Sequence, residues 1–255
     1  MHVVFTPSWY PDRNRPHNGS FFRDQARMLQ RSGMRVGVIA LEPVSFWQAR
    51  RELTVDAEEG IVVVRGTVPT IPKGVLPGDR MVARAVAARA VRLYEETIRS
   101  LPESSSSGGG ESVPDVVHAH VGVVSPFAWS GIAAARRARL PLAVTFHCVL
   151  GPWARVAGAL GPVSPVRMWQ RGGADLTAVS SMLAADVHRA GADDPVTVLP
   201  NGITVEDWRL ERPGPQGRRP HRPVTVVASL RWVERKRPLQ VVRAFAEAVR
   251  SVPGT

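Results

Sequence analysis

The sequence predicts an α/β fold. The first part is a Rossmann-like domain, a mainly parallel sheet with helices on both faces, and the first strand-helix unit of a second Rossmann-like domain follows it. Three observations predict this. Short apolar runs alternate with amphipathic stretches along most of the 255 residues. Such alternation is typical of parallel strands joined by right-handed helical crossovers. A segment rich in Pro, Gly and Arg, residues 209–222, then separates this pattern from one more apolar run and one more helix.

The predicted strands are short runs of apolar, mostly β-branched residues that end at turn signals. Within the first domain they cover residues 3–5, 34–40, 61–64, 116–118, 142–146, 174–178 and 196–199. The predicted helices have apolar residues at helical spacing. One begins at Asn18-Gly19-Ser20 and ends at Ser32-Gly33, and the others cover residues 79–100, 125–137 and 180–190.

The predicted domains follow from these elements. Residues 1–205 are expected to form the first domain, and the Ser- and Gly-rich residues 103–112 a flexible surface loop within it, because the strand-helix alternation resumes afterwards. Residues 206–222 are expected to be a linker. Residues 223–255 are expected to begin the second domain, with a strand from Val224 and a helix over residues 239–249.

The formal net charge is +11, which would suit a nucleic-acid-binding protein. The excess is almost entirely Arg, with Lys73 and Lys236 the only lysines, and no aromatic residues are interleaved to stack on bases. We therefore expect no nucleic-acid partner, while contact with an anionic membrane stays open. Cys148 is the only cysteine, which excludes an internal disulfide and suits a reducing cytoplasm. No signal peptide or apolar run long enough to span a bilayer is visible, so a cytoplasmic location, peripheral at the inner face of a membrane at most, is expected.

Gly19 follows the first predicted strand and stands at the start of a helix. Glycine allows a ligand to approach the free backbone N–H groups there, and the helix N-terminus favours an anion. A turn glycine that only starts the helix is the structural alternative. The dinucleotide-binding GxGxxG pattern and the P-loop pattern are both absent from the sequence.

Histidines lie at the ends of two predicted strands, at the carboxyl edge of a parallel sheet where ligands bind. They are His118 and His120 at the end of one strand and His147 at the end of the next. Imidazoles at this edge can hydrogen-bond sugar hydroxyls or phosphate, or they can bind a metal as in some hydrolases, although no carboxylate motif completes a metal site. A purely structural role is the third alternative.

Arg231 and Lys236 lie in one loop after the apolar run that begins at Val224. The planar fork of Arg and the compact charge of Lys suit the two phosphates of a diphosphate without a metal. A solvated basic loop is the alternative reading.

These segments, in this order, resemble the retaining GT-B glycosyltransferases, the family that includes phosphatidylinositol mannosyltransferases and sucrose synthases. The resemblance covers nearly the whole chain. The stretches that carry it are Pro7-Ser-Trp-Tyr-Pro11, Asn18-Gly-Ser-Phe-Phe22, Asp115-Val-Val-His-Ala-His120, Val144-Thr-Phe-His147, Val179-Ser-Ser181, Val198-Leu-Pro-Asn-Gly-Ile203 and Ala228-Ser-Leu-Arg231 through Lys236.

The resemblance implies roles for individual residues. His147 corresponds to a histidine that contacts the transferred sugar and is the expected catalytic residue, and His120 and Asn18 would lie on the acceptor or sugar side. The donor diphosphate would be bound by Arg231, Lys236 and the backbone of Gly19. No side chain is expected to act as a nucleophile.

The resemblance also implies the partners: a nucleotide-sugar donor, a sugar, lipid or small-molecule acceptor, and no metal or other cofactor. The family's second domain normally supplies a pair of glutamates seven residues apart, for which no room follows Lys236. We therefore expect this chain to be a truncated form with little activity alone. Two alternatives stay open: a noncatalytic acceptor-binding or partner subunit, and a metal-dependent hydrolase that uses His118, His120 and His147.

Overall fold

The structure is a computed structural model. It describes residues 1–7, 9–70, 77–100, 114–121, 135, 139–150, 164–209, 226–230 and 232–251. The chain divides into two compact units, Met1–Val205 and Glu206–Thr255.

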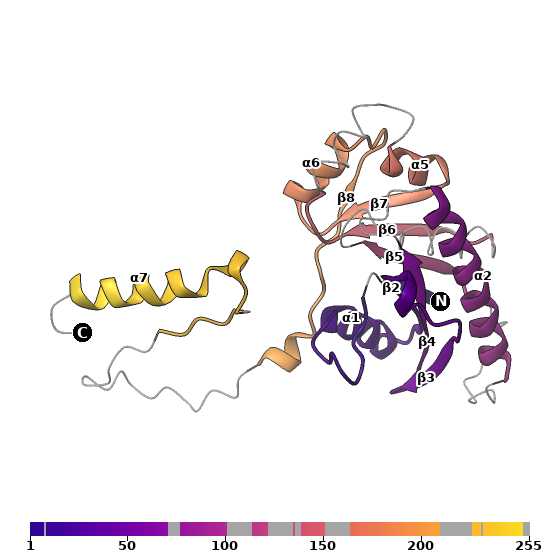
Figure 1. Ribbon diagram of the computed structural model, residues 1–255, viewed down its shortest axis with the longest axis horizontal. Coiled ribbons are helices and arrows are strands. Elements are labelled where there is room, and N and C mark those ends of the chain that lie inside the picture. Colours follow the sequence, from indigo (N-terminus) through magenta and orange to yellow (C-terminus); the bar gives the residue numbers. More distant parts are fainter. Residues whose placement is uncertain are drawn as a thin grey trace. The chain divides into compact units, whose positions relative to one another are not determined.

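Within the described residues, eight strands form one sheet at the centre of the first unit, in the order β3-β4-β2-β1-β5-β6-β7-β8 (Figure 1). Neighbouring strands are parallel, except β3 and β4, which are antiparallel. The predicted α/β fold with a mainly parallel sheet is therefore confirmed. The strands are β1 (His2–Pro7), β2 (Arg35–Ser45), β3 (Thr54–Glu58), β4 (Ile61–Thr70), β5 (Val116–Val121), β6 (Leu142–Phe146), β7 (Ala174–Ala178) and β8 (Thr197–Val198).

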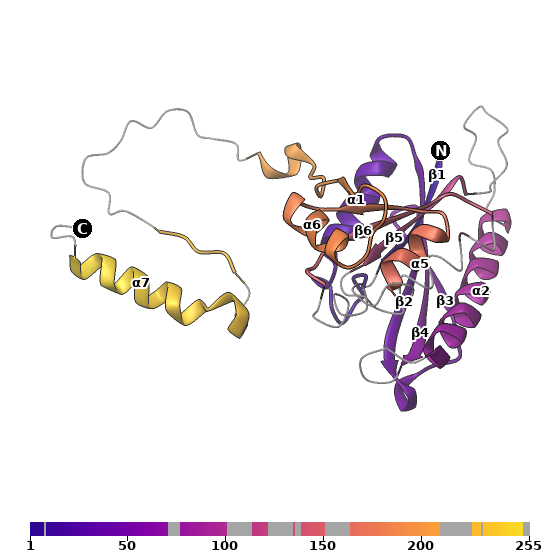
Figure 2. The same ribbon diagram turned by 90° about the horizontal axis from the view of Figure 1, so that it is seen from above.

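Helices cover both faces of the sheet, as predicted (Figure 2). Side chains along a strand alternate between the faces, so two separate apolar clusters form. One cluster joins Val3 and Phe5 of β1 to α1 (Ser20–Arg31). The other contains Val4 of β1 and extends to three helices on the opposite face: α2 (Pro77–Ser100), α5 (Pro165–Arg171) and α6 (Ser181–Arg189).

Some elements differ from the sequence-based expectation. The strand β3 and the helix α5 were not predicted, because β3 is largely exposed and lacks an apolar run, and α5 has only seven residues. The strands β2, β4 and β5 continue several residues beyond their predicted ends. The expected loop over residues 103–112 lies outside the described residues, and of the predicted helix 125–137 only Ala135, which is helical, is described.

In the second unit, the predicted terminal helix is present as α7 (Pro238–Ser251), preceded by the short 3-10 helix η3 (Glu234–Lys236). The prediction of a strand from Val224 is wrong for its described part, residues 226–230, which form no strand. Strand pairing needs a neighbour, and the described part of this unit contains no other strand. The expected linker begins with the 3-10 helix η2 (Val205–Trp208), and residues 210–225 lie outside the described part of the chain.

Among the helices that the structure describes, none is both long enough and apolar enough to cross a membrane.

Candidate functional site

The three histidines singled out from the sequence meet at the carboxyl ends of β5 and β6. Because β5 continues to Val121, His118 and His120 both lie within it and on the same face. His147 follows β6 directly, and its backbone N–H donates to the carbonyl of Val121 at 2.9 Å. Two segments 27 residues apart in sequence are thus held together by the strand pairing of β5 and β6.

Hydrogen bonds tie these imidazoles into two short chains. The Nδ1 of His120 lies 3.0 Å from the Nε2 of His147, so one ring donates and the other accepts. The Nε2 of His118 lies 2.7 Å from the Oγ1 of Thr145, whose oxygen is 2.5 Å from the Oγ1 of Thr177 on β7. Thr177 had not been singled out from the sequence, because a threonine within a strand carries no signal of its own.

Aromatic rings surround the pair formed by His120 and His147. The ring of Phe5 on β1 lies 4.7 Å from that of His120, measured between centroids. The first turn of α1 supplies Phe21 and Phe22, whose centroids lie 5.3 Å and 5.0 Å from that of His147. An apolar surrounding of this kind disfavours a charged imidazole.

Burial lowers the pKa of all three histidines. It lowers the pKa of His118 to about 4. Burial, and in second place the neighbouring His118, lower the pKa of His147 to about 4 as well. The pKa of His120 lies well below its ordinary value through burial and the two neighbouring imidazoles. At neutral pH the site therefore offers uncharged rings that donate and accept hydrogen bonds, and no fixed positive charge.

Gly19 is the residue that starts α1 and so places Phe21 and Phe22 beside His147. Its φ of 76° lies in the left-handed region. A Cβ atom at this position would lie 2.5 Å from Cδ1 and 2.6 Å from the carbonyl oxygen of Trp9. The backbone conformation and this contact explain the glycine without a ligand, and the expected contact with a donor diphosphate stays a prediction.

A pocket of about 190 Å³ lies beside the loop that leads from β1 into α1. Strands β2 and β4 form one side of it, because they stay paired to Ser45 and Thr70, well beyond the last pair of β1 and β2 at Phe5 and Val38. Asn18, which was expected on the acceptor side, is half-buried and lines this pocket.

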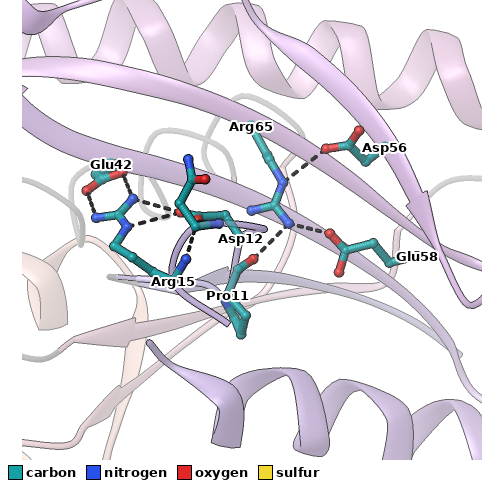
Figure 3. A network of polar contacts seen from close by, with 8 residues as sticks. Pro11, Asp12, Arg15, Glu42, Asp56, Glu58 and Arg65 are labelled. Atoms are coloured by element: carbon teal, nitrogen blue, oxygen red, sulfur yellow. Dashed lines mark hydrogen bonds and ion pairs between the residues drawn. The ribbon is translucent and has the colours of Figure 1, made fainter. Parts of the chain in front are cut away.

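Two arginines are held at the pocket by ion pairs (Figure 3). Arg15 donates to both carboxylate oxygens of Glu42, at 2.5 Å and 2.6 Å, and to Asp12 at 2.8 Å. Arg65 donates to Asp56 at 3.1 Å, to Glu58, and to the carbonyl oxygen of Pro11 at 2.9 Å. The sequence contained a signal for this network that was not used: Glu42 and Arg65 each end a buried apolar run.

The predicted diphosphate-binding residues belong to the second unit. Lys236 is exposed at the end of η3, and Arg231 lies outside the described residues. Their expected proximity therefore remains a prediction.

The described residues contain no group of three His, Cys, Asp or Glu side chains placed to hold a metal ion. In particular, His120 and His147 direct a ring nitrogen at each other, and His118 directs one at Thr145, so these nitrogens do not meet at a common point.

A comparison with protein families matches residues 19–207 to Glycosyltransferase Family 4. This segment includes Gly19, His118, His120 and His147 and covers well over half of the chain. The chain belongs to Glycosyltransferase Family 4. The predicted resemblance to the GT-B glycosyltransferases is thereby confirmed at the level of the family.

The Family 4 chain also matches solved structures at low identity. One, from E. coli, is described as trehalose-6-phosphate bound with UDP-2-fluoro glucose, with 12% identity and a TM-score of 0.45. Another is the α,α-trehalose 6-phosphate synthase of Burkholderia multivorans, with 10% identity and a TM-score of 0.45. In each case the match covers 81% of this chain and 50% of the other, so the Family 4 chain spans about half the length of these structures. No curated protein matches it.

Proposed function

We propose that this Family 4 chain takes part in the transfer of a sugar from a nucleotide-sugar donor to an acceptor hydroxyl, with retention of the anomeric configuration. The observation that carries the proposal is the family match over residues 19–207, which contains the histidine-bearing sheet edge. In the reaction, the bond between the anomeric carbon and the diphosphate oxygen breaks and the acceptor oxygen bonds to that carbon. The nucleoside diphosphate leaves with the electron pair, and the hydroxyl proton is released.

His147 is the proposed contact for the transferred sugar. Its Nε2 is engaged with His120, while its Nδ1 is a buried atom without a hydrogen-bond partner among the described residues. A neutral imidazole whose other nitrogen is fixed presents one defined hydrogen-bonding atom to a sugar hydroxyl. His120 would act as the positioning residue for that ring.

The second unit is proposed to bind the donor diphosphate through Arg231 and Lys236. Two cations would stabilise the negative charge that develops on the leaving group, so the transfer would need no resident metal ion. Gly19 would approach the same diphosphate with its backbone N–H, at the start of α1.

The acceptor is proposed to enter the pocket that Asn18 lines in the first unit. A sugar, a small molecule or the headgroup of a lipid would fit this assignment. The net charge of +11 of the whole chain is consistent with a protein that works at the surface of an anionic membrane.

The test is a transfer assay with the natural gene product, including any residues that flank this sequence in the genome, and a panel of labelled nucleotide sugars. The proposal expects transfer by that product and little transfer by the 255-residue chain alone, because closure of two domains over the donor is what assembles such a site. Strong transfer by the 255-residue chain without a partner chain would contradict the proposal that a complete donor-binding domain is needed for transfer.

The same preparation separates the two alternatives. Acceptor binding without transfer by the natural gene product would favour a noncatalytic acceptor-binding subunit. Zinc at one equivalent per chain, together with metal-dependent hydrolysis and no transfer, would favour the hydrolase.

A further inference from the structure

The 3-10 helix η1 (Phe46–Gln48) presents two large aromatic side chains at the surface of the first unit. Phe46 is 78% exposed and Trp47 is 82% exposed. Every other Phe, Tyr or Trp side chain that the structure describes in the first unit is buried or partly buried. A single exposed apolar residue is ordinary on a protein surface, but two adjacent exposed aromatic rings indicate a surface that meets a partner.

The backbone around these rings is held by hydrogen bonds, so their exposure is part of the fold. The N–H of Ala49 donates to the carbonyl of Phe46 at 3.3 Å and closes the turn. The N–H of Arg50 donates to the Oγ1 of Thr67 on β4 at 2.7 Å, and this hydroxyl donates back to the carbonyl of Arg50 at 3.0 Å. The segment that carries Phe46 and Trp47 is therefore fixed before it by β2 and after it by Thr67, and binding would not have to order it.

Exposed arginines accompany the two rings. Arg50 and Arg51 follow η1 closely in the chain, and Arg89 of α2 donates to the carbonyl of Arg51 at 3.0 Å. None of these three arginines forms an ion pair with any residue that the structure describes, in contrast to Arg15 and Arg65. Their guanidinium groups are therefore available to an anionic partner.

The acidic residues nearby do not cancel this positive charge. Arg89 lines a groove beside α2 together with three other charged residues, Arg92, Glu52 and Glu96. With Arg50 and Arg51 added, this part of the surface has four guanidinium groups and two carboxylates, which is a formal excess of two positive charges.

The helix η1 lies at the carboxyl edge of the sheet, because it follows β2 directly. Strands β2 and β4 run side by side to this edge (Figure 2). Strands β5 and β6 are parallel to β2 through β1, so their carboxyl ends, where His120 and His147 lie, belong to the same edge. A partner bound at η1 would thus contact the edge of the sheet that carries the histidines.

The size of the aromatic surface separates two kinds of partner. Two aromatic side chains bury roughly 300–500 Å² together, whereas a stable protein interface buries about 800 Å² on each partner. A lipid bilayer needs no matching surface of that size. Tryptophan is favoured at the level of the lipid headgroups, arginine is attracted to anionic lipids, and peripheral membrane contact combines these two contributions.

We infer that η1 is a membrane contact. Phe46 and Trp47 insert at the headgroup boundary of an anionic bilayer, and Arg50, Arg51 and Arg89 contact the lipid phosphates. The inference deepens the proposed function, because it names the surface through which the chain meets a membrane, and its test needs no sugar transfer.

The experiment is vesicle flotation with the 255-residue chain, in which unbound or aggregated protein does not rise with the vesicles. The probes are vesicles of phosphatidylcholine alone and vesicles of phosphatidylcholine with an equal amount of phosphatidylglycerol. The anionic vesicles should bind about tenfold or more tightly, and salt should weaken this binding. Equal binding of both vesicles, or binding of neither, would overturn the inference.

Three variants show whether η1 makes the contact. Phe46→Ala and Trp47→Ala should each lower the affinity for anionic vesicles about tenfold, the loss expected when roughly 60 Å² of ring surface is no longer buried. Arg51→Gln should lower it about fivefold. The urea midpoint should stay as in the parent chain, because all three side chains are exposed. Anionic binding that none of the three variants lowers would overturn the inference.

Two matched controls keep the effect specific to this surface. Trp232→Ala removes a ring that is 72% exposed in the second unit. Arg171→Gln removes an exposed arginine at the end of α5, which leads into β7 and so lies at the opposite edge of the sheet. Both variants should bind anionic vesicles as the parent chain does. A loss with either control as large as that with its η1 counterpart would overturn the inference.

A second copy of this chain is the rival partner for the two rings. Analytical ultracentrifugation without lipid should give the same mass for the parent chain and for Trp47→Ala. A dimer that Trp47→Ala dissociates would make η1 a contact between copies and overturn the inference. Vesicle binding through η1 without any sugar transfer by the natural gene product would overturn the proposed function alone, and sugar transfer by a product that does not bind vesicles would overturn this inference alone.

Discussion

The Nε2 of His147 lies 3.0 Å from the Nδ1 of His120, and both rings sit among Phe5, Phe21 and Phe22. The contact needs one donor and one acceptor nitrogen, so two charged rings would repel each other and lose it. The pair is therefore stable in its uncharged form. This relationship makes the sheet edge sensitive to pH.

The free energy of unfolding should fall as the pH falls from about 6.5 to about 4. Burial lowers the folded-state pKa of His118 and of His147 to about 4 from an ordinary 6.5, so in this window the unfolded chain binds more protons than the folded chain. Each histidine contributes a slope of up to about 1.4 kcal/mol per pH unit, and its contribution is complete above pH 6.5. Urea unfolding at several pH values measures the slope.

The matched comparison for this prediction uses His118→Gln and His17→Gln. The first removes a buried imidazole and should flatten the slope by up to about 1.4 kcal/mol per pH unit, whatever its effect on stability at pH 7.5. The second removes an exposed imidazole and should leave the slope as it is. If the free energy of unfolding has the same pH slope in the parent chain and in both variants, protonation of His118 costs the folded chain no free energy, which would contradict the prediction.

Gly19→Ala should destabilise the first unit more than Gly33→Ala. Both glycines have a positive φ, 76° and 82°, so both variants suffer the left-handed strain of roughly 1–2 kcal/mol. A Cβ at Gly33 meets nothing within 4 Å, whereas one at Gly19 collides with Trp9. We expect Gly19→Ala to cost at least about 1 kcal/mol more in urea unfolding, by analogy with overpacking. Equal costs would mean that Trp9 moves away freely.

Lys236→Ala should lower sugar transfer by the natural gene product by ~10²-fold or more, as does the loss of one preorganised donor to a developing negative charge. Arg250→Ala is the control, because Arg250 is a cation on α7 of the same unit, paired with Glu247 at 3.0 Å. Initial rates at saturating donor make the comparison. If both variants keep the parent rate, Lys236 has no part in stabilising the leaving group.

Much of the fold could be predicted from the sequence because the central strands are buried on both faces. The strands β1 and β6 appear as apolar runs between turn signals, and the parallel pairing of the sheet follows from the helices between its strands. The antiparallel strand β3 left no such run, since its residues Thr54 to Ala57 are exposed. The strand expected from Val224 was predicted from its apolar composition, but composition alone cannot supply a pairing partner.

The histidine pair illustrates how far the sequence reaches into the site. Sheet topology predicts that His120 and His147 are neighbours, because both stand at the carboxyl edge of adjacent parallel strands. It cannot predict that Phe21 and Phe22 of α1 close over them, since this depends on the angle set by the left-handed turn at Gly19. The ion pair of Arg15 with Glu42 joins two residues that are 27 apart in the sequence. Arg15 lies in the loop before α1 and Glu42 lies on β2, and no spacing rule predicts such a contact.

The central claim is that the histidine-bearing sheet edge of this Family 4 chain acts on a nucleotide-sugar donor. The most direct measurement compares donor-dependent sugar transfer by the natural gene product with that of its His147→Ala and His17→Ala variants, with circular dichroism and urea midpoints as checks on folding. The account predicts a loss of about tenfold or more for His147→Ala in a folded protein, because a lost hydrogen bond in a buried site costs about 1–3 kcal/mol, and no loss for His17→Ala. Transfer per folded molecule that His147→Ala leaves unchanged would make this histidine a core residue and contradict the account.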